Sequence, residues 1–184
     1  MIEVNIPAEP AGQNSCKWLR ETTMRIADVC SRRVVCVGPE ACAEDAAQTM
    51  HRQDVGALVV VRTGKRKPVG ILTDRDLVTR VIASGRDPRS VPVAEVMTRN
   101  LATCRGDHEL LDVLGMMGER SIRRVPVVDA KGELIGIVTT DDLIGALGEH
   151  VLTLARSVLG AEVLEQRRYG NPGAPARAKR AARR

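Results

Sequence analysis

The sequence GILTDRDL at residues 70–77 recurs in altered form as GIVTTDDL at residues 136–143. Both copies contain a Gly, two apolar residues, a Thr, two variable residues, an Asp and a Leu. Each copy follows an apolar, strand-like run and precedes a helix-like one, a pattern that predicts a strand leading directly into a helix. Because the copies start 66 residues apart, the chain is predicted to consist of two related units.

The repetition extends to the residues around the motif. Residues 26–29 (IADV) correspond to residues 93–96 (VAEV), and a short strand is predicted after each, at residues 34–37 and 101–104. An amphipathic helix follows in both units, because apolar residues recur at i, i+3, i+4 and i+7. The residues of this stripe are Ala43, Ala46, Ala47 and Met50 in the first unit and Leu110, Val113, Leu114 and Met117 in the second.

Two further strands are predicted in each unit, joined by a polar turn. They lie at residues 57–61 and 68–72 in the first unit and at residues 124–128 and 134–139 in the second. Their apolar runs are nearly continuous, which is typical of sheets that helices cover on both faces. The predicted fold class is therefore α/β (α+β), with two pseudo-symmetric repeats, each a small three-stranded sheet flanked by helices.

Breaks in composition divide the chain into five segments. A helix is predicted to follow each motif, over residues 73–83 and 139–147. The segments are a flexible N-terminal extension (1–23), the first repeat (24–87), the second repeat (88–148), a further amphipathic helix (149–168) and a basic tail (169–184) whose Gly, Pro, Ala, Lys and Arg content predicts disorder.

The composition excludes several classes of protein. Of all residues 43% are hydrophobic but only 1% are aromatic. An aliphatic core can form, whereas the aromatic stacking platforms of single-strand nucleic-acid binders cannot be built in number. No apolar run approaches the roughly 20 residues of a membrane helix, and no apolar signal core opens the chain. We therefore expect a cytoplasmic protein with no membrane association.

The net charge of +5 is concentrated in the tail. Seven of the 28 basic residues follow Glu165 without an acidic residue among them, so the rest of the chain has 21 basic and 23 acidic residues. Such a tail leaves salt-dependent, sequence-independent binding of nucleic acid open as an alternative function. A solubilising or partner-docking tail is favoured, because no groove-reading motif accompanies the cations.

The sequence predicts neither a catalytic nor a metal site. His51, His108 and His150 lack the Glu-x-x-His and His-x-x-x-His spacings of metal ligands. The five cysteines form no CxxC pair and are expected to be buried or unused thiols. No nucleophile elbow is present, and no carboxylate pair stands outside the two motifs. We therefore expect a protein that is not an enzyme and requires no cofactor.

The motif has a structural and a functional interpretation. Thr73 with Asp76, and Thr139 with Asp142, fit a capping box at a helix N-terminus. The same geometry offers a phosphate the free N–H groups of the helix and a Thr hydroxyl, while the Asp can accept hydrogen bonds from both hydroxyls of a ribose. Two copies at corresponding places in a duplicated unit favour a ribose-phosphate site over a cap alone.

At residues 24–147 the chain resembles a tandem pair of cystathionine-beta-synthase (CBS) domains, a Bateman module. The pattern Gly-apolar-apolar-Thr-x-x-Asp is intact in both copies, and the order helix, strand, helix, two strands, helix is similar to that family's repeat. Residues 123–129 (RRVPVVD) are similar to the family's second-strand segment. The first copy has GALVVV at residues 56–61 instead, without the two Arg residues and the Pro.

The resemblance implies an allosteric or sensor module that binds an adenosine nucleotide in clefts between its repeats. AMP, ADP and ATP are the implied ligands, with S-adenosylmethionine and NAD(H) as further options. The implied motif residues, in which Asp holds the ribose and Thr lies near the phosphate, are Thr73, Asp74, Arg75, Asp76, Thr139, Thr140 and Asp142. The implied adenine contacts are Val34, Val35 and Ala57 in one cleft and Leu101, Ala102 and Val125 in the other, with Arg124 and Pro126 beside them.

The residues next to each Thr differ in charge between the copies. Asp74 and Arg75 follow Thr73, whereas Thr140 and Asp141 follow Thr139. A phosphate near Thr139 would therefore need cations from elsewhere, such as Arg124 or the arginines at the strand entries. We expect the cleft of the first motif to prefer the more highly phosphorylated ligand.

The resemblance also bears on the partners of the chain. Such modules often associate in pairs, and the apolar face of residues 151–159 has no partner within either repeat, so we expect a homodimer. The segments outside the repeats span about 23 and 37 residues, so we expect any output to pass through an unknown protein effector. A structural dimerisation module with empty clefts remains a second alternative.

Overall fold

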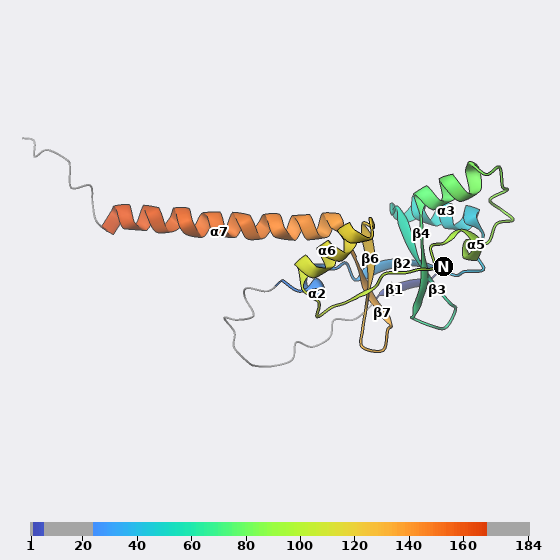
Figure 1. Ribbon diagram of the computed structural model, residues 1–184, viewed down its shortest axis with the longest axis horizontal. Helices are drawn as coiled ribbons and strands as arrows, with labels where there is room; N and C mark the ends of the chain where they lie inside the picture. Colours follow the sequence, from blue (N-terminus) through green and yellow to red (C-terminus); the bar gives the residue numbers. More distant parts are fainter. Residues whose placement is uncertain (1, 6–23, 169–184) are drawn as a thin grey trace, which may run out of the picture. The chain divides into compact units, whose positions relative to one another are not determined.

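The computed structural model describes residues 2–5 and 24–168 (Figure 1). The chain divides into two compact units, Met1–Ile144, which contains the sheets, and Gly145–Arg184, which begins within the last helix. The predicted basic tail and most of the N-terminal extension lie outside the described residues.

The elements follow the predicted order in both repeats. The first repeat contains α2 (Ile26–Val29), β2 (Arg33–Val37), α3 (Ala43–Gln53), β3 (Ala57–Val61), β4 (Pro68–Thr73), α4 (Asp74–Leu77) and the π-helical turn η1 (Val78–Ile82). The second contains α5 (Val93–Val96), β5 (Cys104–Arg105), α6 (Leu110–Glu119), β6 (Arg124–Val128), β7 (Leu134–Thr139) and α7 (Thr140–Arg168).

Three elements differ from the sequence-based expectation. The strand expected at residues 101–104 is reduced to β5, which pairs with β6 at only two positions. The helix after the second motif does not stop at residue 147, because α7 continues without a break to Arg168 and includes the segment predicted as a separate helix. Residues 2–5 were expected in a flexible extension but form the strand β1 (Ile2–Asn5).

Each repeat contains the predicted three-stranded sheet. In the first, β2 runs parallel to β3, and β3 pairs with β4 in antiparallel orientation; in the second, β5, β6 and β7 repeat this arrangement. The strand β1 pairs antiparallel with β2 and extends the first sheet to four strands. The predicted fold class is confirmed, with an edge strand added by the N-terminal residues.

The burial pattern explains the continuous apolar runs. All five residues of β3 are buried, because α3 and α5 pack on one face of the sheet and β7 packs on the other. The larger cluster joins Ala46, Leu58, Leu72 and Val93 with their neighbours. Ala47, expected on the buried face of α3, is exposed, and Thr49 is buried in the same helix instead.

The first short helix of each repeat packs against the other repeat. The N–H of Val93 in α5 donates to the carbonyl of Ala41 at 2.8 Å, and the N–H of Ile26 in α2 donates to the carbonyl of His108 at 3.0 Å. These bonds occupy equivalent positions in the two copies. The two repeats are therefore interleaved within one unit.

The motif glycines lie where this interleaving brings two backbones together. Ile71 and Thr98 exchange backbone hydrogen bonds of 3.1 and 2.8 Å, and Ser31 and Ile137 exchange two of 2.9 Å. A Cβ atom added at Gly70 would stand 3.0 Å from the carbonyl oxygen of Thr98, closer than an ordinary van der Waals contact. The first residue of each motif is Gly because the partner repeat's entry segment crosses over it.

Candidate functional site

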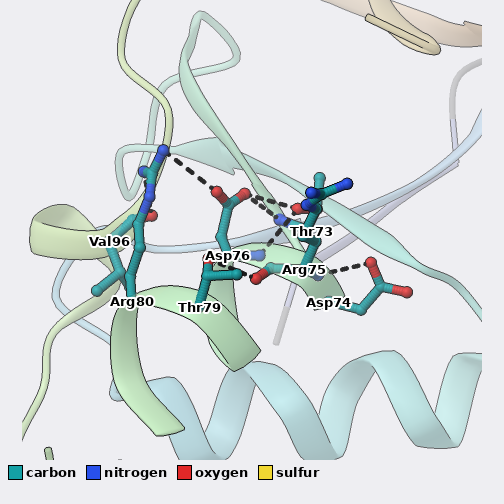
Figure 2. A network of polar contacts seen from close by, with 7 residues as sticks. All are labelled: Thr73, Asp74, Arg75, Asp76, Thr79, Arg80 and Val96. Carbon is teal, nitrogen blue, oxygen red and sulfur yellow. Dashed lines mark hydrogen bonds and ion pairs between the residues drawn. The ribbon is translucent and has the colours of Figure 1, made fainter. Parts of the chain in front are cut away.

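Thr73 and Asp76 form a closed capping box at the start of α4 (Figure 2). The N–H and the hydroxyl of Thr73 both donate to Oδ2 of Asp76, at 2.9 and 2.7 Å. The N–H of Asp76 in turn donates to Oγ1 of Thr73 at 3.2 Å. The strand-to-helix turn predicted from the sequence is therefore fixed by the side chains of the motif itself.

Thr139 and Asp142 repeat this geometry at the start of α7. The N–H and the hydroxyl of Thr139 each donate to Oδ2 of Asp142 at 2.8 Å, and the N–H of Asp142 donates to Oγ1 of Thr139 at 3.2 Å. Both carboxylates are partly buried. In each copy, the second carboxylate oxygen takes no part in the cap.

The second oxygen has different surroundings in the two copies. The Oδ1 atom of Asp76 lies 3.3 Å from an Arg80 guanidinium nitrogen, and another nitrogen of Arg80 donates to the carbonyl of Val96 at 2.8 Å (Figure 2). Ala146 stands four residues after Asp142, where Arg80 stands after Asp76. The two motifs form the same helix cap, but the second carboxylate oxygen faces an arginine only in the first motif.

A cleft of about 160 Å³ joins the second motif to the first repeat. Arg33, Val34 and Val35 line it from β2, and Val55, Gly56 and Ala57 line it at the entry to β3. The second repeat contributes Arg124, Ile137 and Thr139. The Thr of the second motif thus faces the apolar segment of the first repeat, so the site lies between the repeats.

Two charged side chains converge beside Gly56. A Cβ atom built at Gly56 would stand 3.1 Å from a guanidinium nitrogen of Arg124 and 3.2 Å from Oδ2 of Asp74. Arg124 pairs with Thr139 through the β6–β7 ladder, and its side chain makes no hydrogen bond or ion pair with the described residues. The cations that the Asp141-containing motif lacks are therefore present in the cleft lining, as Arg124 on the strand beside Thr139 and Arg33 from the first repeat.

The structure brings together some of the residues predicted from the sequence and separates others. Thr139, Arg124, Val34, Val35 and Ala57 line one cleft. Ala102, Val125 and Pro126 are buried and are not among the residues that line this cleft. Arg75, next to Asp74 in Figure 2, is exposed, while Leu101 and Thr140 are partly buried.

Sequence reasoning missed four lining residues of the cleft and the role of Arg80. Arg33 was considered only as a general source of charge, and Val55, Gly56 and Ile137 were not considered as contacts. The sequence could have identified these four residues, because each precedes a predicted strand or lies within one. Arg80 gave a weaker signal, because its place four residues after Asp76 is the ordinary spacing of a helix ion pair.

Burial raises the pKa of three thiols in the described part of the chain. Burial, aided by the negative charge of Asp142, outweighs nearby Arg32 and raises the pKa of Cys30. Burial also raises the pKa of Cys36 to about 11 and that of Cys104 to about 12. Among residues 2–5 and 24–168, no group of three or more His, Cys, Asp or Glu side chains could hold a metal ion. No helix in this described part is long and apolar enough to cross a membrane.

Comparison with known proteins places this fold in a family. The family model for the CBS domain matches residues 26–83 and 93–149. An uncharacterized protein from Methanopyrus kandleri is 34% identical over 122 residues, which cover 66% of this chain and 62% of that protein. Hypoxic response protein 1 from Mycobacterium tuberculosis is 35% identical over 131 residues, 71% of this chain and 89% of that protein.

The solved structures agree with the sequence relatives. A CBS-domain-containing protein from Agrobacterium tumefaciens superposes with a TM-score of 0.61 at 32% identity, covering 67% of this chain and 98% of its own. The matched residues include both motifs and the cleft between the repeats. The chain therefore belongs to the CBS-domain family and contains two copies of that domain.

Proposed function

We propose that this chain is a cytoplasmic regulatory module that binds an adenosine nucleotide between its two CBS domains and acts on a partner protein. AMP, ADP and ATP are the first candidates, and S-adenosylmethionine and NAD(H) share the same adenosine group. The module binds its ligand without transforming it, because the Thr and Asp of each motif are engaged in a cap and burial disfavours the thiolate of nearby Cys30.

The observation that supports this proposal is the cleft between Thr139 and the first repeat. Its volume of about 160 Å³ is smaller than the roughly 300 Å³ of a typical small-molecule pocket, so it suits a flat base rather than a whole nucleotide. Val34, Val35 and Ala57 offer the base an apolar surface. The ribose then lies toward Asp142, and Arg33 and Arg124 attract the phosphates.

Thermal denaturation with each candidate ligand tests the proposal. A ligand at 100 times its dissociation constant adds about 2.7 kcal/mol to the stability of a protein that binds it only when folded. We expect at least one of AMP, ADP, ATP, S-adenosylmethionine and NADH to raise the melting temperature. No shift with any of them would favour an interpretation in which the motifs are structural caps.

Asp142→Asn separates nucleotide binding from capping. The Asn carbonyl can still accept from Thr139, but its NH2 group then points a donor at the ribose hydroxyls, which themselves need an acceptor. We expect binding to weaken at least about tenfold, as for loss of a charge-assisted hydrogen bond. Glu119→Gln, which removes one exposed carboxylate at the end of α6, is the matched control and should bind normally.

We also propose that the chain forms a homodimer. Val78 and Ile144 hold equivalent positions, two residues after the motif Asp, and are 58% and 59% exposed. Ile82, one turn beyond Val78, is 63% exposed. These apolar side chains are exposed at equivalent places in both repeats. A second copy of the chain would cover them in a symmetric dimer.

Sedimentation velocity tests the dimer. Val78→Glu with Ile82→Glu should shift the wild-type dimer to a monomer, whereas Thr63→Glu, in the exposed β3–β4 turn, should not. A monomeric wild-type protein, or a dimer unaffected by the two Glu substitutions, would contradict this second proposal and leave the nucleotide proposal intact.

A further inference from the structure

The two motif carboxylates differ in how much hydrogen-bonding capacity they have left. In both copies Oδ2 already accepts two hydrogen bonds from the Thr of the motif. The Oδ1 atom of Asp76 also faces Arg80 at 3.3 Å. Within the described residues, Oδ1 of Asp142 accepts no hydrogen bond. The copies therefore offer a ligand different acceptors.

A ribose needs two free acceptor positions on the motif carboxylate, and only the second copy offers both. Its 2′- and 3′-hydroxyls are two adjacent donors, and a carboxylate has about four lone-pair positions. The Thr donors use two of them in each copy, which leaves two at Asp142. At Asp76 the Arg80 guanidinium stands within ion-pair distance of the remaining oxygen, so it competes with the ribose hydroxyls for that oxygen.

Arg80 is held in this position from both ends of its guanidinium. One nitrogen faces Asp76, and the other donates at 2.8 Å to the carbonyl of Val96, the last residue of α5 (Figure 2). The side chain of Asp76 is 13% exposed, against 46% for Arg80. The carboxylate side of the pair is therefore better shielded from water than in an ordinary surface ion pair.

We propose that Arg80 is a positioning residue that withholds the Asp76 carboxylate from a ribose, so that an adenosine nucleotide binds first at Asp142. This inference rests on the proposed nucleotide-binding function and adds an order of occupancy to it. Binding at Asp76 requires Arg80 to leave the carboxylate. The Arg80 side chain, which also donates to the Val96 carbonyl at the end of α5, is then no longer held by the ion pair. Occupancy of the Asp76 carboxylate is thereby linked to the position of α5.

Calorimetric titration with AMP tests the order of occupancy. We expect one strong site per wild-type chain, weakened at least about tenfold by Asp142→Asn and unaffected by Asp76→Asn. Arg80→Ala should strengthen the second site about fivefold, as expected for loss of a competing, partly exposed ion pair, and Asp76→Asn in that background should remove the gain. The control Arg89→Ala breaks an ion pair of the same 3.3 Å length with Glu44, away from the cleft, and should change nothing.

Two further measurements distinguish the proposed competition at the carboxylate from a general loss of stability: the reverse substitution at the second motif and a ligand without the 2′-hydroxyl. Ala146→Arg places a guanidinium four residues after Asp142 and should weaken the strong site. Replacing AMP by 2′-deoxy-AMP should cost affinity at Asp142 in the wild type, and at Asp76 only after Arg80→Ala. A variant that only changed the stability of the fold would not change the ratio of the affinities for AMP and 2′-deoxy-AMP.

The outcomes separate the inference from the function on which it rests. Two equal AMP sites in the wild type, or an Arg80→Ala protein that binds AMP as the wild type does, would overturn the order of occupancy and leave nucleotide binding established. Failure of AMP to bind the wild type and every variant would overturn the inference. If the other adenosine ligands also gave no thermal shift, the proposed function would be overturned as well.

Discussion

The backbone of Ser31 passes directly over Gly136: a Cβ atom at Gly136 would stand 3.0 Å from the carbonyl oxygen of Ser31. The Sγ atom of Cys30 would lie at 3.1 Å on the same side. Because Ser31 and Ile137 exchange two backbone hydrogen bonds here, the segment cannot move aside without breaking the junction between the repeats.

Gly136→Ala should therefore destabilise the fold by about 1–3 kcal/mol, the usual cost of forcing extra atoms into a packed contact. Urea denaturation measures this change. The control is Gly115→Ala in α6, where an added Cβ meets nothing within 4 Å. That substitution should leave stability unchanged or raise it by about 0.5–1 kcal/mol, because Ala favours a helix interior. Equal midpoints for the two variants would refute the close approach.

Thr139→Val tests the second cap without changing side-chain volume. Val cannot accept from the N–H of Asp142 or donate to its carboxylate, so we expect a loss of about 1–2 kcal/mol in the free energy of unfolding. Thr139→Ser retains both hydrogen bonds and should lose much less. Guanidinium denaturation of the three proteins provides the comparison, and equal losses for Val and Ser would show that the hydroxyl does not stabilise the helix start.

Leu143 closes the second motif and is fully buried. Leu143→Ala should lower the free energy of unfolding by about 2–5 kcal/mol, because the lost contacts leave a cavity. Leu143→Met, which nearly conserves volume, should cost less than about 1.5 kcal/mol. A Leu143→Ala protein as stable as the Met variant would indicate that this position is not packed as the structure describes.

The buried thiols predict a loss of stability at high pH. Their pKa values rise from 9.0 to about 11 for Cys36 and about 12 for Cys104 on folding, because burial disfavours the thiolate. The unfolded chain therefore releases these protons at lower pH than the folded one. The stabilisation is complete below pH 9 and declines as the pH rises toward 11–12.

Urea midpoints measured at pH 8 and pH 10 check this linkage. The wild type should lose more stability between the two values than a Cys36→Ala, Cys104→Ala double variant, whatever the two absolute stabilities are. Parallel declines would contradict the assigned pKa shifts, because the remaining Lys and Tyr side chains titrate in both proteins.

Local patterns were sufficient to predict most elements. Thr73 and Asp76 are three residues apart after an apolar strand, and capping depends only on residues within one turn. The same holds for the stripe that begins at Ala43. Expectations for β5 and for the end of α7 were less accurate, because strand length depends on a partner and helix ends depend on packing and caps that periodicity does not encode.

The site was only partly predictable for a related reason. The sequence identified Thr139 and Asp142 as a unit, but it could not show that their cleft is completed by Val34 and Gly56 of the other repeat. That neighbourhood depends on two interleaved helices more than 60 residues apart along the chain. The position of Arg80 four residues after Asp76 was visible in the sequence, whereas its hydrogen bond to the carbonyl of Val96 was not.

The sequence by itself determined the duplication, the strand-to-helix turn in each copy and the capping pair, since each depends on residues close together in the chain. Only the tertiary structure decided why the motif begins with Gly and which segments share a cleft. It also showed that the matching Asp residues are unequal acceptors. These features depend on distances between segments that are remote in sequence, set by the packing of the two repeats on each other.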